Sequence, residues 1–472
     1  MPESGLIECV LLVNSKKQVI KQLPQNYENQ AILKSVGEFC FPWQQVQNST
    51  SSIQEFTFVQ TQQDVVRFYG FVRLKLSENR AIVLISKFQD FAHTFMQILR
   101  VVEKDWENIK INSDNTKTVG HTDSNSEYPE LTNSSNTSIT LSNATTSLFT
   151  LSPTSLSPGT HIQLPLTVSQ NLQAITPDKR YLPRTENCQY LLEFVAYYKN
   201  DKSPNLHRLK ALISIYCSIM HERVIILLSE NLSIVTSLLH AFSSLIFPLN
   251  WEHMFTPILP ASMIQYVGAP FPALIGIHKS LLYEAEPFID KTNVLIVDLD
   301  QTDTSPIIND PYQDDKSLPG EVVQFLLEKL EKVDTQGDDL SQTFLDAQAK
   351  LLAGYHDGFK IDLDRKLQYS FEEFPNIKRK WIMKHKHAYF EVMITLQCFK
   401  QFIDNQLDAL NKNSPPPHSA VFDEAVRKVE NDNQLTAAFS FAKAKAKTVG
   451  KSAAFKIKAR NGKIAKTEMK KQ

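Results

Sequence analysis

The chain has 472 residues, of which 42% are hydrophobic and 21% charged, and its formal net charge is −1. This length suits two or three domains, and the composition allows a packed core and excludes global disorder. A net charge so close to zero excludes an argument for nucleic-acid binding from the protein as a whole.

The five cysteines are scattered, and no two of them form a CxxC pair. An odd, dispersed set predicts reduced thiols in a cytosolic protein, and we interpret these cysteines as small core residues. The first residues have an acid before a short apolar run, which predicts a strand in place of a signal peptide. Residues 231–251 carry no formal charge, but they are too rich in polar residues and proline for a membrane span. We interpret them as a buried core helix and the loop after it.

The first hundred residues predict a compact α/β module. Apolar runs and alternation predict strands at 6–13, 56–59, 67–74 and 81–86, the second and third forming a hairpin. Helical spacing of apolar residues predicts a helix that starts at Phe88 and ends at Trp106.

Two further segments interrupt this pattern. An aromatic cluster at 39–43, Phe-Cys-Phe-Pro-Trp, predicts a loop between the first strand and the hairpin. Residues 112–158 are dominated by Ser, Thr and Asn, so they cannot bury enough apolar surface to offset the entropy of ordering. We predict a disordered linker there.

The second half of the chain alternates strands and helices. Strands are predicted at 161–168, 224–228, 273–277 and 293–300, and helices at 209–220, 232–246, 321–333, 344–354 and 388–410. This succession predicts a second α/β domain with a helical subdomain. Three consecutive prolines after Lys412 predict the end of that subdomain.

A rigid loop follows the helix at 232–246. Pro248 ends the helix, because proline has no N–H to donate and clashes with the preceding turn. Bulky or rigid residues then fix the path of the chain up to the strand at 273–277: Trp251, Pro257, Pro260, Pro270 and Pro272.

The last thirty residues, from Lys443 to Gln472, contain eleven Lys or Arg and one acid, Glu468. Such a segment suits a basic helix on an anionic membrane, where each basic residue contributes about 1 kcal/mol. A merely solvated tail is the alternative, since few apolar residues accompany the charge. The membrane-contact candidates are Lys443, Lys445, Lys447, Lys451, Lys456, Lys458, Arg460 and Lys463.

One stretch suggests enzyme chemistry. Asp298 and Asp300 follow a buried strand as DxDxT, the pattern of magnesium-dependent phosphatases of the haloacid-dehalogenase type, and Gly337-Asp338-Asp339 resembles their second acidic motif. The spacing is too short for the strands, the Ser/Thr and the Lys that such a fold needs between the two motifs. Aspartates that cap the turn after a strand are the structural alternative. The chain has no GxxxxGK[ST], GxGxxG or GxSxG motif, so the residues favour a binding or regulatory protein without cofactor or metal.

The stretch from His221 to His278 resembles the central block of DENN domains. The matching positions are Glu222-Arg223, His240, Pro248, Trp251, His253, Pro257, Leu259-Pro260, Ala269-Pro270, Pro272, Leu274, Ile275, Gly276 and His278. Further segments resemble the connecdenn branch of that family: Phe39–Pro42 with Phe56–Val59, Leu318-Pro319 with Val322-Val323, Gly337-Asp338, Ala347–Ala349, and Phe399–Asp404 with Leu407-Asp408. The long carboxyl-terminal tail through which relatives bind clathrin and its adaptor has no counterpart, so coat binding is not carried over.

The resemblance implies an α/β protein in five regions. They are an upstream, longin-like module (1–110), a disordered linker (111–160), a central DENN domain (161–298), a downstream helical region (299–412) and a basic tail (413–472). It also implies guanine-nucleotide exchange on a Rab GTPase, with the Rab thirty-five type as the expected client, in endocytic and endosomal traffic. No chemical catalysis is expected, because an exchange factor works by differential affinity for the states of its client.

The Rab is expected to sit between the first two modules. The contact candidates are Phe39, Phe41, Pro42 and Trp43 from the first module, and Trp251, His253, Tyr266, Pro270 and Pro272 from the second. A purely structural role is the alternative for Trp251 and Pro270, and His240 is expected to be a hydrogen-bonded core histidine. A Rab-binding scaffold without exchange activity remains an alternative function. The expected location is cytoplasmic, peripheral on clathrin-coated vesicles, endosomes or the plasma membrane.

Overall fold

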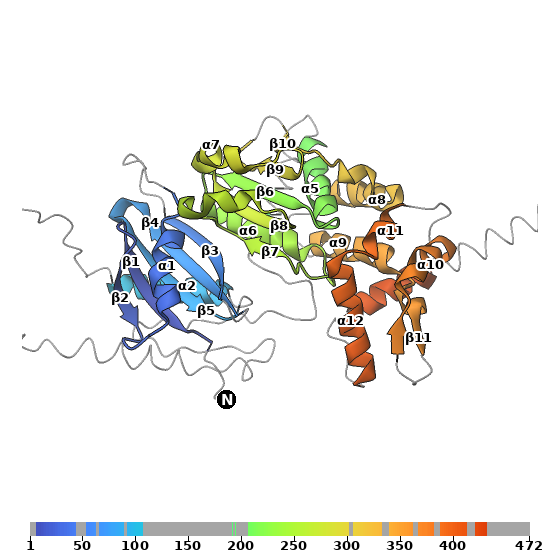
Figure 1. The fold of residues 1–472 in the computed structure, drawn as a ribbon, viewed down its shortest axis with the longest axis horizontal. Helices are drawn as coiled ribbons and strands as arrows, with labels where there is room; N and C mark the ends of the chain where they lie inside the picture. The colour runs from blue at the N-terminus through green and yellow to red at the C-terminus, as the bar shows by residue number, and fades with distance from the viewer. Residues whose placement is uncertain are drawn as a thin grey trace, which may run out of the picture. The chain divides into compact units, whose positions relative to one another are not determined.

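The computed structural model describes residues 6–43, 53–62, 66–88, 92–106, 191, 194, 206–301, 305–332, 339–361, 367–381, 388–412 and 421–431 (Figure 1). The chain divides into two compact units, and each is described by itself. The first comprises Met1–Lys316 with Leu326–Gln342, and the second comprises Ser317–Phe325 with Thr343–Gln472. Strands and helices are mixed, so the α/β class is confirmed. The predicted linker, the strand at 161–168 and the basic tail apart from residues 421–431 lie outside the described residues.

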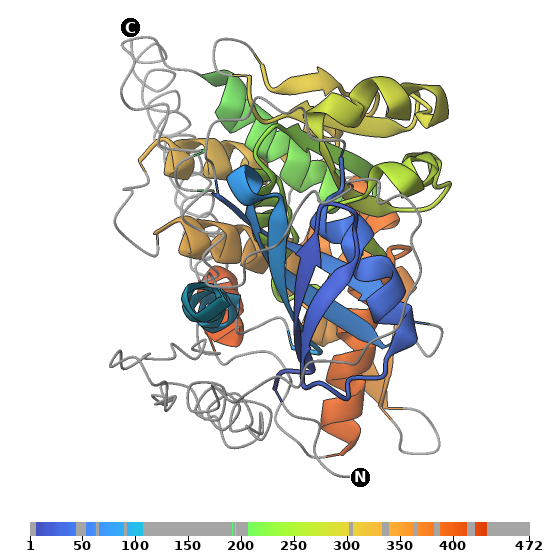
Figure 2. The same cartoon turned by 90° about the vertical axis from the view of Figure 1, so that its left-hand side faces the viewer.

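The amino-terminal module is built on a five-stranded antiparallel sheet, drawn in blue and facing the viewer in Figure 2. Its strand order is β2-β1-β5-β4-β3, so β5 lies between β1 and β4. The predicted hairpin is confirmed, because β3 and β4 pair along their whole length. The strands are β1 (Cys9–Asn14), β2 (Val19–Leu23), β3 (Ile53–Thr61), β4 (Arg67–Lys75) and β5 (Arg80–Ser86).

Two helices cover this sheet. In α2 (Ala92–Trp106), Phe95 and Leu99 are buried in one cluster with Phe71 of β4 and Leu84 of β5. In α1 (Gln30–Cys40), Phe39 stacks on Phe58 of β3 with ring centroids 4.6 Å apart.

The prediction of a loop at 39–43 was wrong in its first two residues, which form the last turn of α1. The reason is helical spacing: Ile32, Val36 and Phe39 are all buried and recur on one face. Asn29 caps the helix, since its side chain accepts a hydrogen bond from the amide of Ile32.

The central module is built on a second five-stranded sheet in the order β10-β9-β6-β8-β7. Strands β9, β6, β8 and β7 run parallel, and β10 pairs antiparallel with β9. The predicted strands at 224–228 and 273–277 are confirmed, and both are buried throughout, as a covered parallel sheet requires. The strands are β6 (Val224–Ser229), β7 (Met254–Thr256), β8 (Ala273–His278), β9 (Val294–Asp298) and β10 (Ile307–Asn309).

The helices predicted before and after β6 in the sequence are confirmed as α5 (Leu206–Ile219) and α6 (Leu232–Ser244). Helix α6 packs closely on β8. A Cβ added to Gly276 would lie 2.5 Å from Val235 Cγ1 and 2.0 Å from the carbonyl oxygen of Pro257. This position therefore needs glycine. Between β7 and β10 lie four short helices: η3 (Ala261–Gly268), η4 (Lys279–Leu281), α7 (Leu282–Ala285) and η5 (Glu286–Phe288).

The described part of the second unit is mainly helical, with one hairpin. Its core gathers Tyr355, Phe374, Phe399 and Phe402, all buried. The elements downstream of β10 are η6 (Asp314–Lys316), α8 (Gly320–Leu330), α9 (Asp339–Leu352), η7 (Tyr355–Gly358), β11 (Phe359–Ile361), β12 (Leu367–Tyr369), η8 (Phe371–Glu373), α10 (Phe374–Trp381), α11 (Ala388–Met393) and α12 (Gln397–Asn411).

Two predictions for this region were wrong. The segment 388–410 is not one helix, because α11 ends at Met393 and α12 begins at Gln397. The ordered region also does not end at Lys412, because residues 421–431 are helical and bury Phe422 and Val426 completely.

Candidate functional site

A group of exposed aromatic side chains lies in the central module, on the short helices and, for Phe271, on the loop between η3 and β8. We call it the aromatic surface. Its members and their exposed fractions are Tyr266 (52%), Phe271 (50%), Tyr283 (86%) and Phe288 (47%). Large apolar side chains left in water at neighbouring positions are typical of a partner-binding surface.

The support under the aromatic surface is rigid. Ile264 and Val267 of η3 and Ala285 of α7 are buried in the core of the central module. A Cβ added to Gly268 would lie 2.5 Å from the carbonyl oxygen of Phe288, so η3 and η5 approach each other at backbone distance. Tyr266, Tyr283 and Phe288 therefore stand on elements that packing holds in place.

Acidic residues lie among these rings in the chain. Glu284, Glu286 and Asp290 are exposed, and Glu286 forms an exposed ion pair with Lys291 at 2.6 Å. The hydroxyl and amide of Thr292 both donate to Asp290, which lowers the pKa of that carboxyl group. Exposed pairs of this kind contribute little to folding stability.

The five contact candidates predicted in the central module differ in how far they are exposed to solvent. Tyr266 and Pro270 are exposed, and Pro272 is half-buried. Trp251 is buried, and its indole Nε1–H donates to the carbonyl oxygen of Met254 at 3.0 Å. This is the structural role that was the alternative for Trp251.

The fifth candidate, His253, is half-buried. Its Nε2 lies 3.0 Å from the carboxylate of Glu222, and its ring meets Trp251 edge-on, with centroids 5.3 Å apart. The contacts of His253 are therefore made within the chain.

The candidates of the amino-terminal module are mostly buried. Phe39, Phe41 and Pro42 lie in the core, so none of them is exposed for a partner. Trp43 is half-buried and stacks on His278 of the central module, with ring centroids 4.3 Å apart and planes at 3°. We therefore no longer assign Phe39, Phe41, Pro42 or Trp251 to a contact surface.

Strand β3 meets helix α6 along what we call the β3–α6 seam. Thr57 Oγ1 and His240 Nε2 lie 2.8 Å apart, the amide of Glu55 donates to Ser233 Oγ at 3.1 Å, and the amide of Leu232 donates to Gln54 Oε1 at 3.2 Å. Burial lowers the pKa of His240 to about 4, so its ring is neutral near pH 7. The prediction that His240 is a hydrogen-bonded core histidine is confirmed.

The two aspartates at and just after the end of β9, Asp298 and Asp300, form ion pairs with a lysine of the chain. Lys279 Nζ lies 2.9 Å from Asp298 and 3.6 Å from Asp300, and the hydrogen bond with Asp298 raises the pKa of Lys279. Asp300 also accepts from the hydroxyl of Ser229 at 2.6 Å and from the amide of Glu230 at 2.9 Å. These contacts fit the strand-end capping that was the alternative to a phosphatase site.

A polar pocket of about 380 Å³ opens beside these aspartates. Its lining combines the start of β3 with the strand ends of the central sheet: Ile53, Gln54, Glu230, Asn231, Lys279 and Asp300. Lys279 and Asp300 form an ion pair with each other and also contact neighbouring groups. Their opposite charges offset each other, so this pair does not give the pocket an excess of positive or negative charge.

Sequence reasoning missed three members of the aromatic surface. Phe271 stands between Pro270 and Pro272, and rigid residues on both sides of an aromatic ring were a usable signal. Tyr283 and Phe288 lie in a stretch without helical or strand periodicity, so no pattern pointed to them. The eight membrane-contact candidates lie outside the described residues. None of the described helices is both long and apolar enough to cross a membrane.

Comparison with known proteins gives two matched domains. A family model of the uDENN domain matches residues 17–74, and a model of the DENN (AEX-3) domain matches residues 77–302. DENN domain-containing protein 1A of Mus musculus is 30% identical over 417 residues, which is 87% of this chain and 36% of that protein. DENN domain-containing protein 1B of Mus musculus is 30% identical over 423 residues, which is 89% of this chain and 48% of that protein. DENN domain-containing protein 1B of Homo sapiens is also 30% identical, over 89% of this chain and 50% of that protein. The chain thus spans between a third and a half of the length of these relatives.

Proposed function

Because the chain belongs to the DENN domain family, we propose that it is a guanine-nucleotide exchange factor that promotes GDP release from a Rab GTPase. Proteins with DENN domains are in general exchange factors for Rab GTPases, and the match to both the uDENN and the DENN models, at 17–74 and 77–302, carries the proposal. The strand order β2-β1-β5-β4-β3 supports a longin-like assignment for the amino-terminal module.

The proposed mechanism needs binding surfaces and no reacting side chain. An exchange factor binds the nucleotide-free GTPase more tightly than the GDP-bound form, and this difference in affinity drives GDP out. The aromatic surface supplies exposed rings on rigid supports, which is the kind of surface that gives a few residues most of the binding energy. Tyr266, already a contact candidate from the sequence, lies within it, and Pro270 is adjacent.

The finer assignments follow the resemblance to the connecdenn branch. We propose a Rab of the thirty-five type as the client, a role in endocytic and endosomal traffic, and a cytoplasmic location peripheral to vesicles, endosomes or the plasma membrane. The remaining contact candidates are Trp43, His253, Tyr266, Pro270 and Pro272. A scaffold that binds a Rab without releasing its nucleotide is the second candidate function. A phosphatase has little support, since Lys279 forms ion pairs with Asp298 and Asp300 at the place where a magnesium ion would bind.

The test is fluorescent GDP release across a panel of purified Rab GTPases. We expect acceleration on at least one of them, and Tyr283→Ala combined with Phe288→Ala should lower kcat/KM about tenfold or more, as loss of central aromatic contacts does. Ile20→Ala is the matched control, because Ile20 is 43% exposed on β2, outside the aromatic surface. No acceleration on any Rab would refute exchange activity. Affinity for a Rab without acceleration would identify the scaffold.

A further inference from the structure

We infer that the β3–α6 seam locks the two modules of the first unit into one preassembled platform, and that His240 is its positioning residue. The effect on nucleotide exchange rests on the proposed function. The lock itself is a property of this chain and can be measured without any GTPase.

The seam provides a hydrogen-bond partner for a backbone group at the outer edge of a sheet. Strand β3 is the last strand of the amino-terminal sheet, so its outward backbone groups have no neighbouring strand to pair with. Ser233 Oγ of α6 accepts from one of them, the amide of Glu55. Helix α6 and strand β7 both contact β3, so the central module covers this edge.

The seam also satisfies the start of a helix. The first amides of α6 have no partner within the helix. The side chain of Asn231 accepts from the amide of Ser233, as an ordinary N-cap does. The amide of Leu232 donates instead to Gln54 Oε1, which belongs to the other module. Each module thus supplies a hydrogen-bond partner for a backbone group of the other, and separating them would exchange both hydrogen bonds for bonds to water.

His240 closes the seam in its most buried part. The ring is neutral and almost fully enclosed, and its Nε2 meets Thr57 Oγ1 at 2.8 Å while Phe255 of β7 packs against it edge-on at 4.9 Å. A polar group in such surroundings is costly without its partner, so this hydrogen bond favours one register of β3 against α6.

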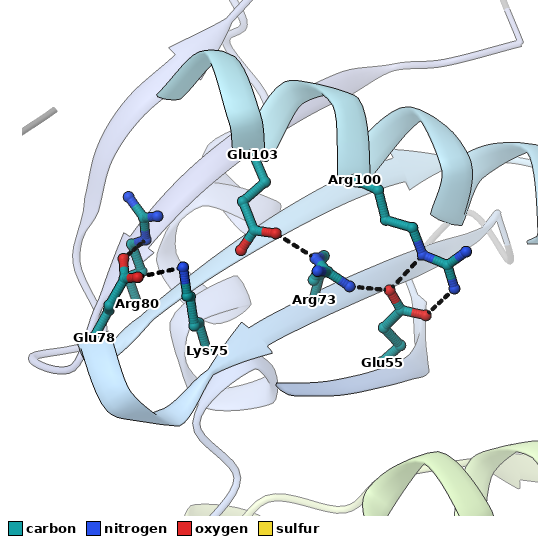
Figure 3. A network of polar contacts seen from close by, with 7 residues as sticks. All are labelled: Glu55, Arg73, Lys75, Glu78, Arg80, Arg100 and Glu103. Carbon is teal, nitrogen blue, oxygen red and sulfur yellow. Dashed lines mark hydrogen bonds and ion pairs between the residues drawn. The ribbon is translucent and has the colours of Figure 1, made fainter. Parts of the chain in front are cut away.

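The side chain of Glu55 ties strand β3 to the rest of the amino-terminal module. Figure 3 shows Glu55 between Arg73 of β4 and Arg100 of α2, with Arg73 also bound to Glu103. Burial raises the pKa of Glu55, but the contacts with Arg100 and Arg73 outweigh it, so the pKa is lowered and the carboxylate stays charged. The residue whose amide joins α6 is therefore held by its side chain to the rest of its own sheet.

A second set of contacts joins the modules at the end of α1. The amide of Ala261 donates to the carbonyl oxygen of Pro42 at 2.8 Å, Ser262 Oγ donates to Glu38 at 2.9 Å, and Trp43 stacks on His278. Because the two modules meet in two places, loss of a single hydrogen bond should loosen the platform without unfolding it.

The consequence for exchange follows from preorganisation. A client that contacts both modules binds only the fraction of molecules in which they are correctly placed, and its apparent affinity falls in proportion to that fraction. Loosening the seam should therefore raise KM for the GTPase and leave kcat unchanged. Irreversible loss of folded molecules would instead reduce the number of active molecules, which lowers the apparent kcat at unchanged KM.

The primary experiment is hydrogen–deuterium exchange on the full chain with Thr57→Val and His240→Phe. Amides in both Ile53–Thr61 and Leu232–Ser244 should exchange about threefold to tenfold faster, since the lost hydrogen bond is shared between them. His240→Gln, whose side-chain amide can replace Nε2, should restore protection. Ser243→Ala is the matched control on the same helix, because Ser243 bonds only the carbonyl oxygen of His240 within α6.

Two results would overturn the inference. Unchanged exchange in both segments would show that the hydrogen bond does not hold the modules together. Faster exchange spread over the whole chain, to the same degree, would show a general loss of stability.

The exchange kinetics are a separate arm. With a responsive Rab, Thr57→Val should raise KM about threefold or more at constant kcat, and a fall in kcat at constant KM would contradict the positioning role. If the wild-type chain releases GDP from no Rab, the proposed function fails, and the deuterium measurement still decides whether the seam is a lock.

Discussion

Two histidines of the first unit illustrate how burial sets chemistry at the scale of single residues. Burial lowers the pKa of His240 to about 4, and it lowers the pKa of His278 to about 4 against the opposing influence of Glu230 and Asp300. Both rings are therefore neutral near pH 7. A neutral imidazole can stack on Trp43 or share a proton with Thr57 without bringing a charge into the core.

These pKa values predict a loss of stability in mild acid. Between about pH 6.5 and 4 the unfolded chain binds a proton at each of these histidines and the folded chain does not. The free energy of unfolding should therefore fall as the pH falls, by about 1.4 kcal/mol per unit and per histidine. Urea unfolding at pH 6.5, 6.0 and 5.5 measures this slope. In His240→Gln the free energy of unfolding should fall less steeply with falling pH, by the contribution of one histidine. An equal slope in the variant and the wild type would contradict a lowered pKa at His240.

At this scale, the sequence was a poor guide to which aromatic side chains are buried. Phe39, Phe41, Pro42 and Trp43 were named as contact candidates, but the fold buries the first three of them. Residue type alone cannot separate the two outcomes, because a buried and an exposed aromatic side chain look alike in one sequence. Tyr283, the most exposed of the aromatic surface, was overlooked for the same reason.

At the scale of elements, strong periodicity was informative. Buried runs such as Val224–Leu228 and the helical spacing in 232–246 placed β6 and α6 to within a few residues. Short strands such as β2 and β7 were missed, because a strand of three to five half-buried residues leaves almost no pattern. Helix α1 was missed although Ile32, Val36 and Phe39 recur at helical spacing. The break between α11 and α12 was also invisible, since apolar spacing continues across it.

The helix at 421–431 is the element with the largest consequence for stability. Phe422 and Val426 are fully buried, Phe422 meets Phe402 of α12 edge-on, and Glu430 accepts from the amide of Gly354 at 2.8 Å. Gly354 has a positive φ of 84° at the end of α9, where its amide has no partner within the helix. The helix thus completes the second unit.

Removing the anchor of this helix should be costly. Phe422→Ala should destabilise the second unit by about 3–5 kcal/mol, the usual effect of truncating a buried phenylalanine. Leu410→Ala, at a side chain 47% exposed on α12, should change stability by less than about 0.5 kcal/mol. Thermal unfolding followed by calorimetry measures both, and similar values for the two variants would show that the helix is dispensable.

At the scale of the whole molecule, charge is divided unevenly along the chain. The net charge of −1 hides a final segment with eleven basic residues and one acid. We predict that this segment brings the chain to anionic membranes, where a Rab GTPase would meet it. The prediction rests on the sequence alone.

Sedimentation with vesicles of phosphatidylcholine and phosphatidylserine tests this prediction. Binding should rise with the phosphatidylserine content and weaken strongly between 50 and 300 mM salt, because the Debye length shortens (it is about 10 Å at 0.1 M). Replacing Lys443, Lys445 and Lys447 by Ala should weaken binding at low salt. Replacing three lysines elsewhere, Lys16, Lys34 and Lys332, should not. Binding that does not respond to salt would exclude an electrostatic anchor.

The position of β5 limits how gene segments that encode such a protein can be recombined. The uDENN match ends at residue 74 and the DENN match begins at residue 77, yet β5 (Arg80–Ser86) lies inside the amino-terminal sheet between β1 and β4. A gene broken between the two matched regions would leave one fragment with a sheet lacking an interior strand and the other with an orphan strand. Recombination can therefore pass on the pair of regions as one block, but not either region by itself.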